Sequence, residues 1–229
     1  MSETKTLTIK PLKKQRLHIV LKGDSDLILN KKSLSFTREE IFKQSHGKGI
    51  SIPDEINSKL HYSMWEKLCT SITWEKPVPE LDRYEDYTEE VWKDWMQNNR
   101  PCILSKAFSS SFYETFVSLG YKDATGRNGT DFKRTVSLEG WKNPIDFASV
   151  TYSQHLTPNT GITKTNVLAQ HNIFSGWRCE IDLIYVPSVF PMETVVEIIS
   201  TAGEFIGIGT KRAEGWGHYH IEDVMTSEA

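Results

Sequence analysis

A glycine-rich segment near the carboxyl end, Gly203 to Asp223, limits the fold of this chain more than any other; it reads GEFIGIGTKRAEGWGHYHIED. An alternating apolar segment from Trp177 to Val186 and a helix-like segment from Pro191 to Ala202 come before it. The tail therefore predicts the order strand, helix, glycine-rich loop, strand. This order favours an α+β sandwich, in which helices pack on one face of a sheet.

Four of the five glycines of this segment are closely spaced around its cations: Gly207, Gly209, Gly215 and Gly217. A connection from a helix to a strand usually needs one glycine, at the end of the helix. The additional glycines would let a ligand backbone pass closely over exposed amides, and Lys211 and Arg212 would supply charge for an anion such as phosphate. Alternatively, the last two glycines mark a bulge or tight bend at the start of an edge strand. The residues alone leave both interpretations open.

Length and composition predict a protein with a packed core. The chain has 229 residues, 38% of them hydrophobic and 11% aromatic, which suits one large domain or two small ones. It has no run of eighteen apolar residues, and its first residues lack the apolar stretch of a secretory signal. We therefore expect a cytoplasmic protein with no membrane partner.

The three cysteines, Cys69, Cys102 and Cys179, are scattered and odd in number. Their spacing favours neither a disulfide framework nor a zinc site, so we expect no metal and no other cofactor. Cys179 falls on the core side of a predicted strand, which predicts a buried thiol.

Charge is unevenly distributed along the chain. The net charge is −3, which argues against a protein that coats nucleic acid through bulk positive charge. Residues 1–48 hold eleven Lys and Arg against five acids, whereas residues 49–98 hold five against eleven. The asymmetry predicts one surface that can meet phosphate and another that can meet a basic partner.

Periodicity predicts the remaining elements. We expect strands at Arg16–Lys22, within residues 25–30, at Asn166–Ile173 and at Trp216–Ile221, and helices that start at Thr37 and span Pro53–Ser71, Tyr87–Asn98 and Ser105–Leu119. Asn128-Gly129 predicts a hairpin turn, because this dipeptide favours the positive φ angles of such turns.

Two histidines, His218 and His220, fall in the last predicted strand. Being two residues apart, their side chains would emerge on the same face. They could act as acid and base in metal-free RNA cleavage, in which a 2′-hydroxyl attacks the adjacent phosphate. They could also bind a metal, although the sequence shows no third ligand. A third possibility is two exposed histidines without catalytic function.

The Ala-Gly, GIG, Lys-Arg and GWGHYHI elements between Gly203 and Ile221 resemble the last loop and strand of the RAMP superfamily, whose members build and process CRISPR RNA complexes. They also resemble the ends of phage-encoded relatives, in which a Trp-Arg strand, here Trp177-Arg178, precedes the helix. The resemblance covers about the last 55 residues. It implies a ferredoxin-like (RRM-like) antiparallel sheet with helices on one face, in a single domain of residues 1–229 with a helical insertion at about 50–120.

The resemblance also implies a function, the binding of RNA or single-stranded DNA without catalysis. Lys211, Arg212 and Arg178 would contact phosphate, the four glycines would let the strand pass, and Trp216 would stack on a base. Self-association, or assembly into a CRISPR-like complex, is a further expectation. Two rival hypotheses are an endoribonuclease that uses His218 or His220, and a phage-type factor that engages a host complex through acidic helices within residues 54–98.

Overall fold

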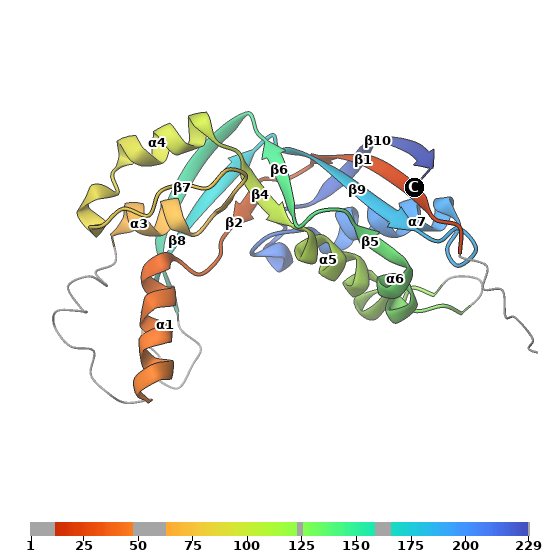
Figure 1. The fold of residues 1–229 in the computed structure, drawn as a ribbon, viewed down its shortest axis with the longest axis horizontal. Coiled ribbons are helices and arrows are strands. Elements are labelled where there is room, and N and C mark those ends of the chain that lie inside the picture. Colours follow the sequence, from red (N-terminus) through yellow and green to blue (C-terminus); the bar gives the residue numbers. More distant parts are fainter. Residues whose placement is uncertain (1–11, 48–62, 123–125, 159–165, 229) are drawn as a thin grey trace, which may run out of the picture.

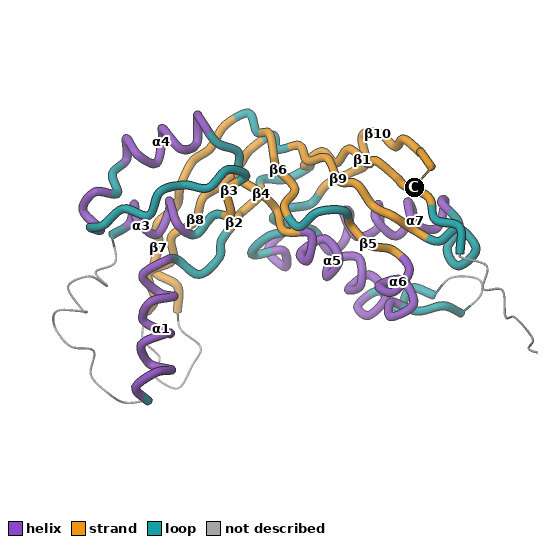
Figure 2. Tube along the Cα trace, viewed as in Figure 1, coloured by secondary structure: helices purple, strands orange, loops and turns teal. Residues whose placement is uncertain are grey.

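The protein has the shape of an arch, with strands β1 (Gln15–Gly23), β9 (Arg178–Tyr185) and β10 (Tyr219–Glu228) in one half and strands β7 (Ser149–Pro158) and β8 (Asn166–Ser175) in the other (Figures 1 and 2). The computed structural model describes residues 12–47, 63–122, 126–158 and 166–228. Within this part of the chain no helix is both long and apolar enough to cross a membrane.

One half of the arch is an antiparallel sheet covered by helices. Its strands pair in the order β10, β1, β9, and β5 and β6 both pair with the other edge of β9, all antiparallel. These strands are β1 (Gln15–Gly23), β5 (Val136–Leu138), β6 (Lys142–Asp146), β9 (Arg178–Tyr185) and β10 (Tyr219–Glu228). The helices are α5 (Ser105–Ser118), α6 (Gly129–Thr135) and α7 (Met192–Thr201).

The connections of this half give the order β, α, β, β, α, β. Helices α5 and α6 come between β1 and the split second strand, β5 and β6, and α7 connects β9 to β10. Both groups of helices lie on the same face of the sheet (Figure 1). The predicted α+β, ferredoxin-like fold is therefore confirmed, and we call this half the ferredoxin-like body.

The spacing of apolar residues, every second residue in the strands and every three or four residues in the helices, explains why this body forms. In β1 the side chains of Leu17, Ile19 and Leu21 point toward the helices and are fully buried. Helix α7 turns Val195 and Ile198, also fully buried, onto the sheet. Each such side chain contributes about 1.5–3 kcal/mol by leaving water, so this interface is the main source of stability in the body.

The other half of the arch, which we call the inserted region, consists of two segments. The first, residues 24–104, contains β2 (Leu27–Leu29), α1 (Leu34–His46), α3 (Met64–Thr70), β3 (Thr73–Trp74), η1 (Tyr84–Asp86), α4 (Glu89–Asn98) and β4 (Pro101–Leu104). The second is the hairpin of β7 (Ser149–Pro158) and β8 (Asn166–Ser175), whose β8 pairs with β2. Strands β4 and β3 extend the main sheet beyond β6.

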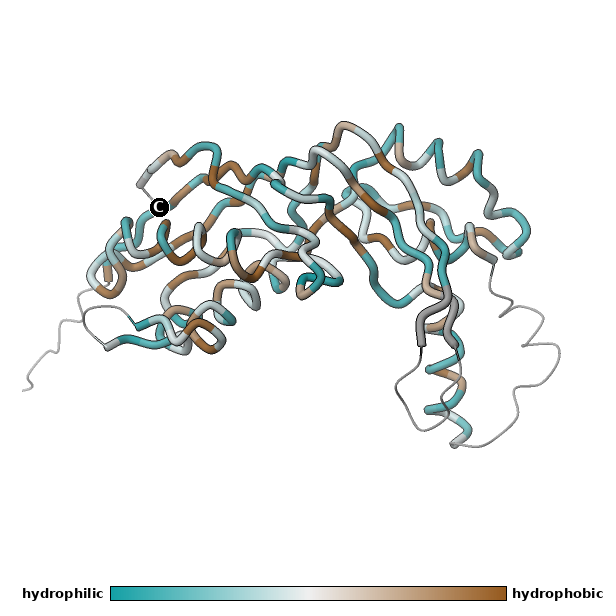
Figure 3. The backbone as a smooth tube through the Cα atoms, turned by 180° about the vertical axis from the view of Figure 1, so that it is seen from behind, coloured by the Kyte–Doolittle hydropathy of each residue, from teal (hydrophilic) through white to brown (hydrophobic). Residues whose placement is uncertain are grey.

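The predicted helical insertion at about 50–120 overlaps this region, and its last part, Ser105–Ser118, is helix α5 of the ferredoxin-like body. Of the predicted helix Pro53–Ser71, residues 53–62 lie outside the described residues, and Met64–Thr70 form α3. The division into one domain with an insertion remains a prediction. Helix α1 extends away from the rest and is largely hydrophilic (Figure 3).

Buried polar contacts attach the hairpin to helices α3 and α4. Asn172 in β8 is fully buried; its Nδ2 donates to the Leu68 carbonyl oxygen at 2.9 Å, and its Oδ1 accepts from Trp92 Nε1 at 2.8 Å. Trp92 also packs edge-on against Tyr152 of β7, with ring centroids 5.7 Å apart. Since every polar atom of this contact has a partner, the hairpin is held in one position relative to the helices.

Two local predictions were wrong because helix capping decided the structure. Helix α1 starts at Leu34 and not at Thr37, since Ser33 is the N-cap residue and its Oγ accepts from the Phe36 amide. Asn128-Gly129 starts helix α6 and does not form a hairpin turn. The Asn128 side chain accepts from the Asp131 amide, and the Asp131 side chain accepts from the Asn128 amide, a reciprocal capping box.

Candidate functional site

The glycine-rich loop, residues 207–217, lies on the inner side of the arch, between the ferredoxin-like body and the inserted region (Figures 1 and 3). Two hydrogen bonds of 2.9 Å attach it to the β2 segment, from the Thr210 amide to the Ile28 carbonyl and from the Gly217 amide to the Asp26 carbonyl. On the body side, Ser111 Oγ of α5 donates to the Gly207 carbonyl at 2.8 Å. The loop therefore connects the two halves.

Close packing within the protein explains most of the glycines. A Cβ on Gly217 would lie 1.9 Å from the Ile208 carbonyl oxygen, and one on Gly209 would lie 2.5 Å from that of Ile28. A Cβ on Gly207 would lie less close, 3.0 and 3.1 Å from the Trp216 and Gly217 carbonyl oxygens. Gly215 is different, because a Cβ there would meet nothing within 4 Å. The close backbone approach that the sequence predicted is thus made, at three positions, by the chain itself.

The two cations of the loop are each paired with a carboxylate. Lys211 Nζ lies 3.1 Å from Glu214 Oε2, and Arg212 Nη1 lies 2.8 Å from Glu114 Oε2 on α5. Lys211 also has a φ of 61°, a left-handed conformation that no other described non-glycine residue has. Such strain is held in place by surrounding structure and is concentrated at functional sites.

A second group of residues meets the loop from the hairpin, and the sequence analysis did not identify it. His171 of β8 is 7% exposed, its ring centroid lies 5.7 Å from that of His155 on β7, and its Nδ1 has no hydrogen-bond partner among the described residues. Burial, followed by the charges of Lys211, His155 and Lys67, lowers the pKa of His171 to about 4. We call His171, His155, Lys67 and Lys211 the His171 cluster.

The sequence carried one signal for this cluster. If the segments around His155 and His171 pair as a hairpin, His171 lies two residues from the partner of His155. Both side chains then project from the same face. The approach of Lys211 and Lys67 could not be seen, because the four residues come from three separate parts of the chain.

The other predicted site residues lie in different places. Trp216 is partly buried in the loop. Arg178 projects from β9 on the face opposite the buried Cys179, and its guanidinium bonds to Glu180 and Glu222, both at 2.8 Å. It therefore shares no contact with Lys211. Cys179 is buried as predicted, and burial raises the pKa of its thiol.

His218 and His220 each contact a different partner. Strand β10 starts at Tyr219, not at Trp216 as predicted, because the loop ends in a turn that holds the residues before it. The Nδ1 atom of His218 lies 2.7 Å from the Glu204 carbonyl oxygen, whereas that of His220 lies 2.5 Å from Asp24 Oδ1. Among the described residues no group of three or more His, Cys, Asp or Glu is arranged to hold a metal ion.

Comparison with known proteins gives weak structural similarity only. No family model and no curated protein matches the chain. A chain in the cryo-EM structure of the Type III-B Cmr-beta bound to cognate target RNA aligns with a TM-score of 0.44 and 11% identity, over 94% of this chain and 61% of that one. Cmr6 from Pyrococcus furiosus aligns with a TM-score of 0.32 and 10% identity, over 92% of this chain and 100% of that one.

Scores of this size do not separate common ancestry from a common arrangement of strands and helices. Membership of the RAMP superfamily, a relationship to phage-encoded proteins, and assembly into a larger complex therefore stay predictions. This chain spans about three fifths of the Cmr-beta chain that it aligns with.

Proposed function

We propose that this protein binds single-stranded nucleic acid, RNA or DNA, on the inner side of the arch, through the glycine-rich loop and the His171 cluster. The observation that carries the proposal is a buried histidine with an unpartnered Nδ1, on whose pKa the charges of Lys211 and Lys67 act against that of Glu214. A phosphate group would balance these charges, and its oxygens would accept hydrogen bonds from the ammonium groups.

The ion pairs of the loop leave it able to bind phosphate. Lys211 and Glu214 are three residues apart, and their side chains are 24% and 60% exposed. Because the Glu214 carboxylate lies largely in solvent, the pair contributes about 1 kcal/mol, and a phosphate can replace Glu214 at little cost. Arg212, whose side chain is 32% exposed, is held by Glu114 beside the path of the strand.

The open side of the loop offers room for a strand. Gly215 has a φ of 89° and no neighbour within 4 Å of a Cβ position, so a nucleic-acid backbone can approach it closely. Trp216 follows it and can stack on a base, a contact that tolerates any sequence. Arg178 lies outside this path, and we do not include it in the proposed interface.

The proposal contains no catalytic step. A metal-independent endoribonuclease needs an acid and a base on either side of one phosphate. His218 and His220 face two different partners, Glu204 and Asp24, and neither belongs to the His171 cluster.

Charge reversal at Lys211 tests the proposal. Lys211→Glu should weaken the binding of labelled oligouridine and oligothymidine about tenfold at low salt, and should reduce the slope of log affinity against log salt by about one or more, because a phosphate contact is lost. Fluorescence anisotropy over a salt series measures both quantities.

Lys93→Glu is the matched control, because Lys93 also pairs with a glutamate on its own segment, Glu89, but lies on α4. It changes the net charge by the same amount and should affect binding far less. Equal affinities of the two variants, with melting curves that show both folded, would make the loop a purely structural connection.

A further inference from the structure

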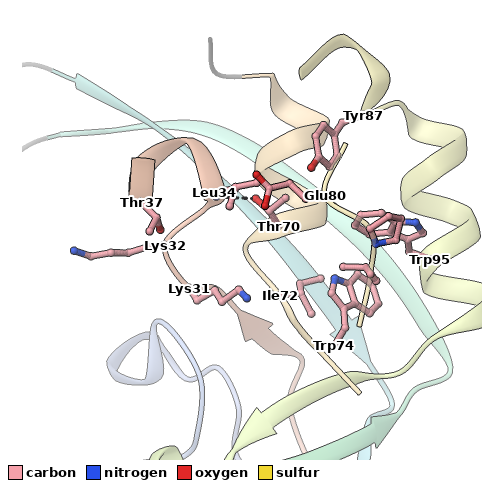
Figure 4. A pocket seen from close by; sticks show the side chains of 12 residues that line it. Lys31, Lys32, Leu34, Thr37, Thr70, Ile72, Trp74, Glu80, Tyr87 and Trp95 are labelled. Atoms are coloured by element: carbon pink, nitrogen blue, oxygen red, sulfur yellow. Dashed lines mark hydrogen bonds between the residues drawn. The ribbon is translucent and has the colours of Figure 1, made fainter. Parts of the chain in front are cut away.

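A pocket of about 350 Å³ lies at the start of helix α1 in the inserted region (Figure 4). Its volume is within the range of small-molecule sites. The apolar part of its wall combines three aromatic and four aliphatic residues: Trp74, Tyr87 and Trp95, with Leu34, Ile72, Val78 and Pro79. Lys31, Lys32 and Glu80 contribute the charges.

Lys31 is the side chain that gives this pocket a chemical preference. Its ammonium extends toward Ile72, whereas Lys32 extends away from the pocket (Figure 4). Among the described residues this ammonium has no hydrogen-bond or ion-pair partner. Loss of hydration lowers the pKa of Lys31, and the charge of Lys142 lowers it further. Lys31 is exposed to solvent, so an anionic ligand can reach its unpartnered ammonium beside the apolar wall.

The positive charge of the neighbouring Lys142 is not balanced by the groups that it contacts at the pocket wall, because these are neutral backbone carbonyls. Its Nζ donates to the carbonyl oxygens of Trp74 and Glu75, at 2.5 and 3.2 Å. Two ammonium groups therefore act on the same region, and a single anion near Lys31 would lower the repulsion between them.

The wall favours a flat ring as the other part of the ligand. Trp95 packs edge to face against both Trp74 and Tyr87, and the three rings together form a rigid aromatic wall. Glu80, held by an ion pair with Arg38, adds carboxylate oxygens at the same pocket. Such oxygens accept hydrogen bonds from the exocyclic amino group of adenine or cytosine, which uracil lacks.

We infer that this pocket binds a nucleoside phosphate, with the base against the aromatic wall and the phosphate at the Lys31 ammonium. The ligand can be a free nucleotide or one residue of a strand. Lys31 follows closely after Ile28, whose carbonyl accepts from Thr210 of the glycine-rich loop, so both sources can reach it. The inference does not depend on the proposed function, because a mononucleotide can bind here without any strand on the loop.

Tryptophan fluorescence tests the inference, since Trp74 and Trp95 line the pocket. We expect AMP to change the emission saturably, and adenosine or inorganic phosphate to bind at least tenfold more weakly, because each lacks half of the recognised groups. UMP should bind more weakly than AMP and CMP. A short oligoadenylate that binds with the affinity of AMP would indicate a nucleotide site, and one that binds much more tightly would indicate a strand.

Lys31→Met should weaken AMP binding about tenfold, and Lys31→Arg should retain most of it. Lys122→Met is the control, because Lys122 is exposed and belongs to the other half of the arch. Saturable binding that Lys31→Met leaves unchanged, or no binding of AMP at millimolar concentration, would overturn the inference. Loss of strand binding in Lys211→Glu with intact AMP binding would separate this site from the proposed interface.

Discussion

The ferredoxin-like body and the inserted region are held together by different kinds of contact. In the body, fully buried aliphatic side chains such as Leu17 and Ile19 of the sheet meet Val195 and Ile198 of α7. In the inserted region, tryptophans pack around buried polar residues, of which Asn172 and Glu66 are 0% and 4% exposed. The body therefore gains its stability from contacts that any aliphatic residue of similar size can make, and the inserted region from contacts that need particular partners.

Glu66 shows this need for particular partners. Its two carboxylate oxygens accept from the amide and the hydroxyl of Ser35 at 3.1 and 2.9 Å, and Thr70 donates to it at 3.0 Å. A carboxylate at this place stabilises the positive end of α1. Since Ser35 is the buried residue of α1, the Glu66 side chain is a main contact that positions the start of the helix.

Gly217 tests whether the glycine-rich loop makes the two halves into one unit. Gly217→Ala should lower the free energy of unfolding by about 4 kcal/mol, because the new methyl group would overlap the Ile208 carbonyl and because a φ of 75° is strained for alanine. Urea denaturation followed by far-UV circular dichroism measures the loss. If the loop couples the halves, the hydrogen-exchange protection of β2 and of β10 should fall together.

Gly215→Ala is the matched control in the same loop. Its φ, 89°, is also positive, but the added methyl group would meet nothing within 4 Å. We expect a loss of about 1 kcal/mol from backbone strain alone. Equal losses in the two variants would mean that the packing of Gly217 against Ile208 adds nothing to stability.

Asn172 tests the polar contacts of the inserted region. Asn172→Leu leaves the Trp92 Nε1 hydrogen and the Leu68 carbonyl without partners, so it should cost about 3 kcal/mol. Hydrogen exchange should show the loss in β7, β8 and α4, with β1 and β9 affected less.

Ser111→Ala is the corresponding change in the body, since Ser111 is also fully buried and donates to the Gly207 carbonyl. One unpaired carbonyl should cost about 1 kcal/mol. A larger loss for Ser111→Ala than for Asn172→Leu would contradict the assignment of particular polar contacts to the inserted region.

The same difference decides how much of the fold could be predicted from the sequence. Strands β1 and β9 and helix α7 were predicted nearly to their ends. Each has one buried face, so its apolar residues recur every second residue in a strand and every three or four residues in a helix. Strands β3, β4, β6 and β7 were not predicted. β3 has two residues, and β4 starts with a proline that indicates a helix break in a sequence. Their pairing depends on partners far along the chain.

The site was predicted in part for a related reason. The glycines and cations of the loop are adjacent in sequence, so the loop was recognised, but a glycine pattern cannot show whether a ligand or the chain itself makes the close approach. For Gly217 it is the Ile208 carbonyl. The His171 cluster joins residues of α3, the hairpin and the loop, and only the assembled fold brings them together.

His171 tests the junction between the halves, with an expected effect smaller than those of Gly217→Ala and Asn172→Leu. A histidine in an unfolded chain has a pKa of about 6.5, whereas in the folded protein burial and the charges of Lys211, His155 and Lys67 lower it to about 4. Between these values the unfolded state binds more protons, so stability should fall as the pH is lowered from about 6.5 to 4 and then level off for this group. We expect a loss of about 2 kcal/mol, less than the full shift implies, because the two lysines are partly exposed.

His171→Gln should remove this part of the pH dependence in urea titrations. His46→Gln should not, because His46 is an exposed histidine on α1. The charge of Glu214 raises the pKa of His171 and so opposes the other charges. If His171→Gln and the unmodified protein lose the same stability between pH 6.5 and 4, other groups cause the loss. His171 would then not report the positive charge at the junction.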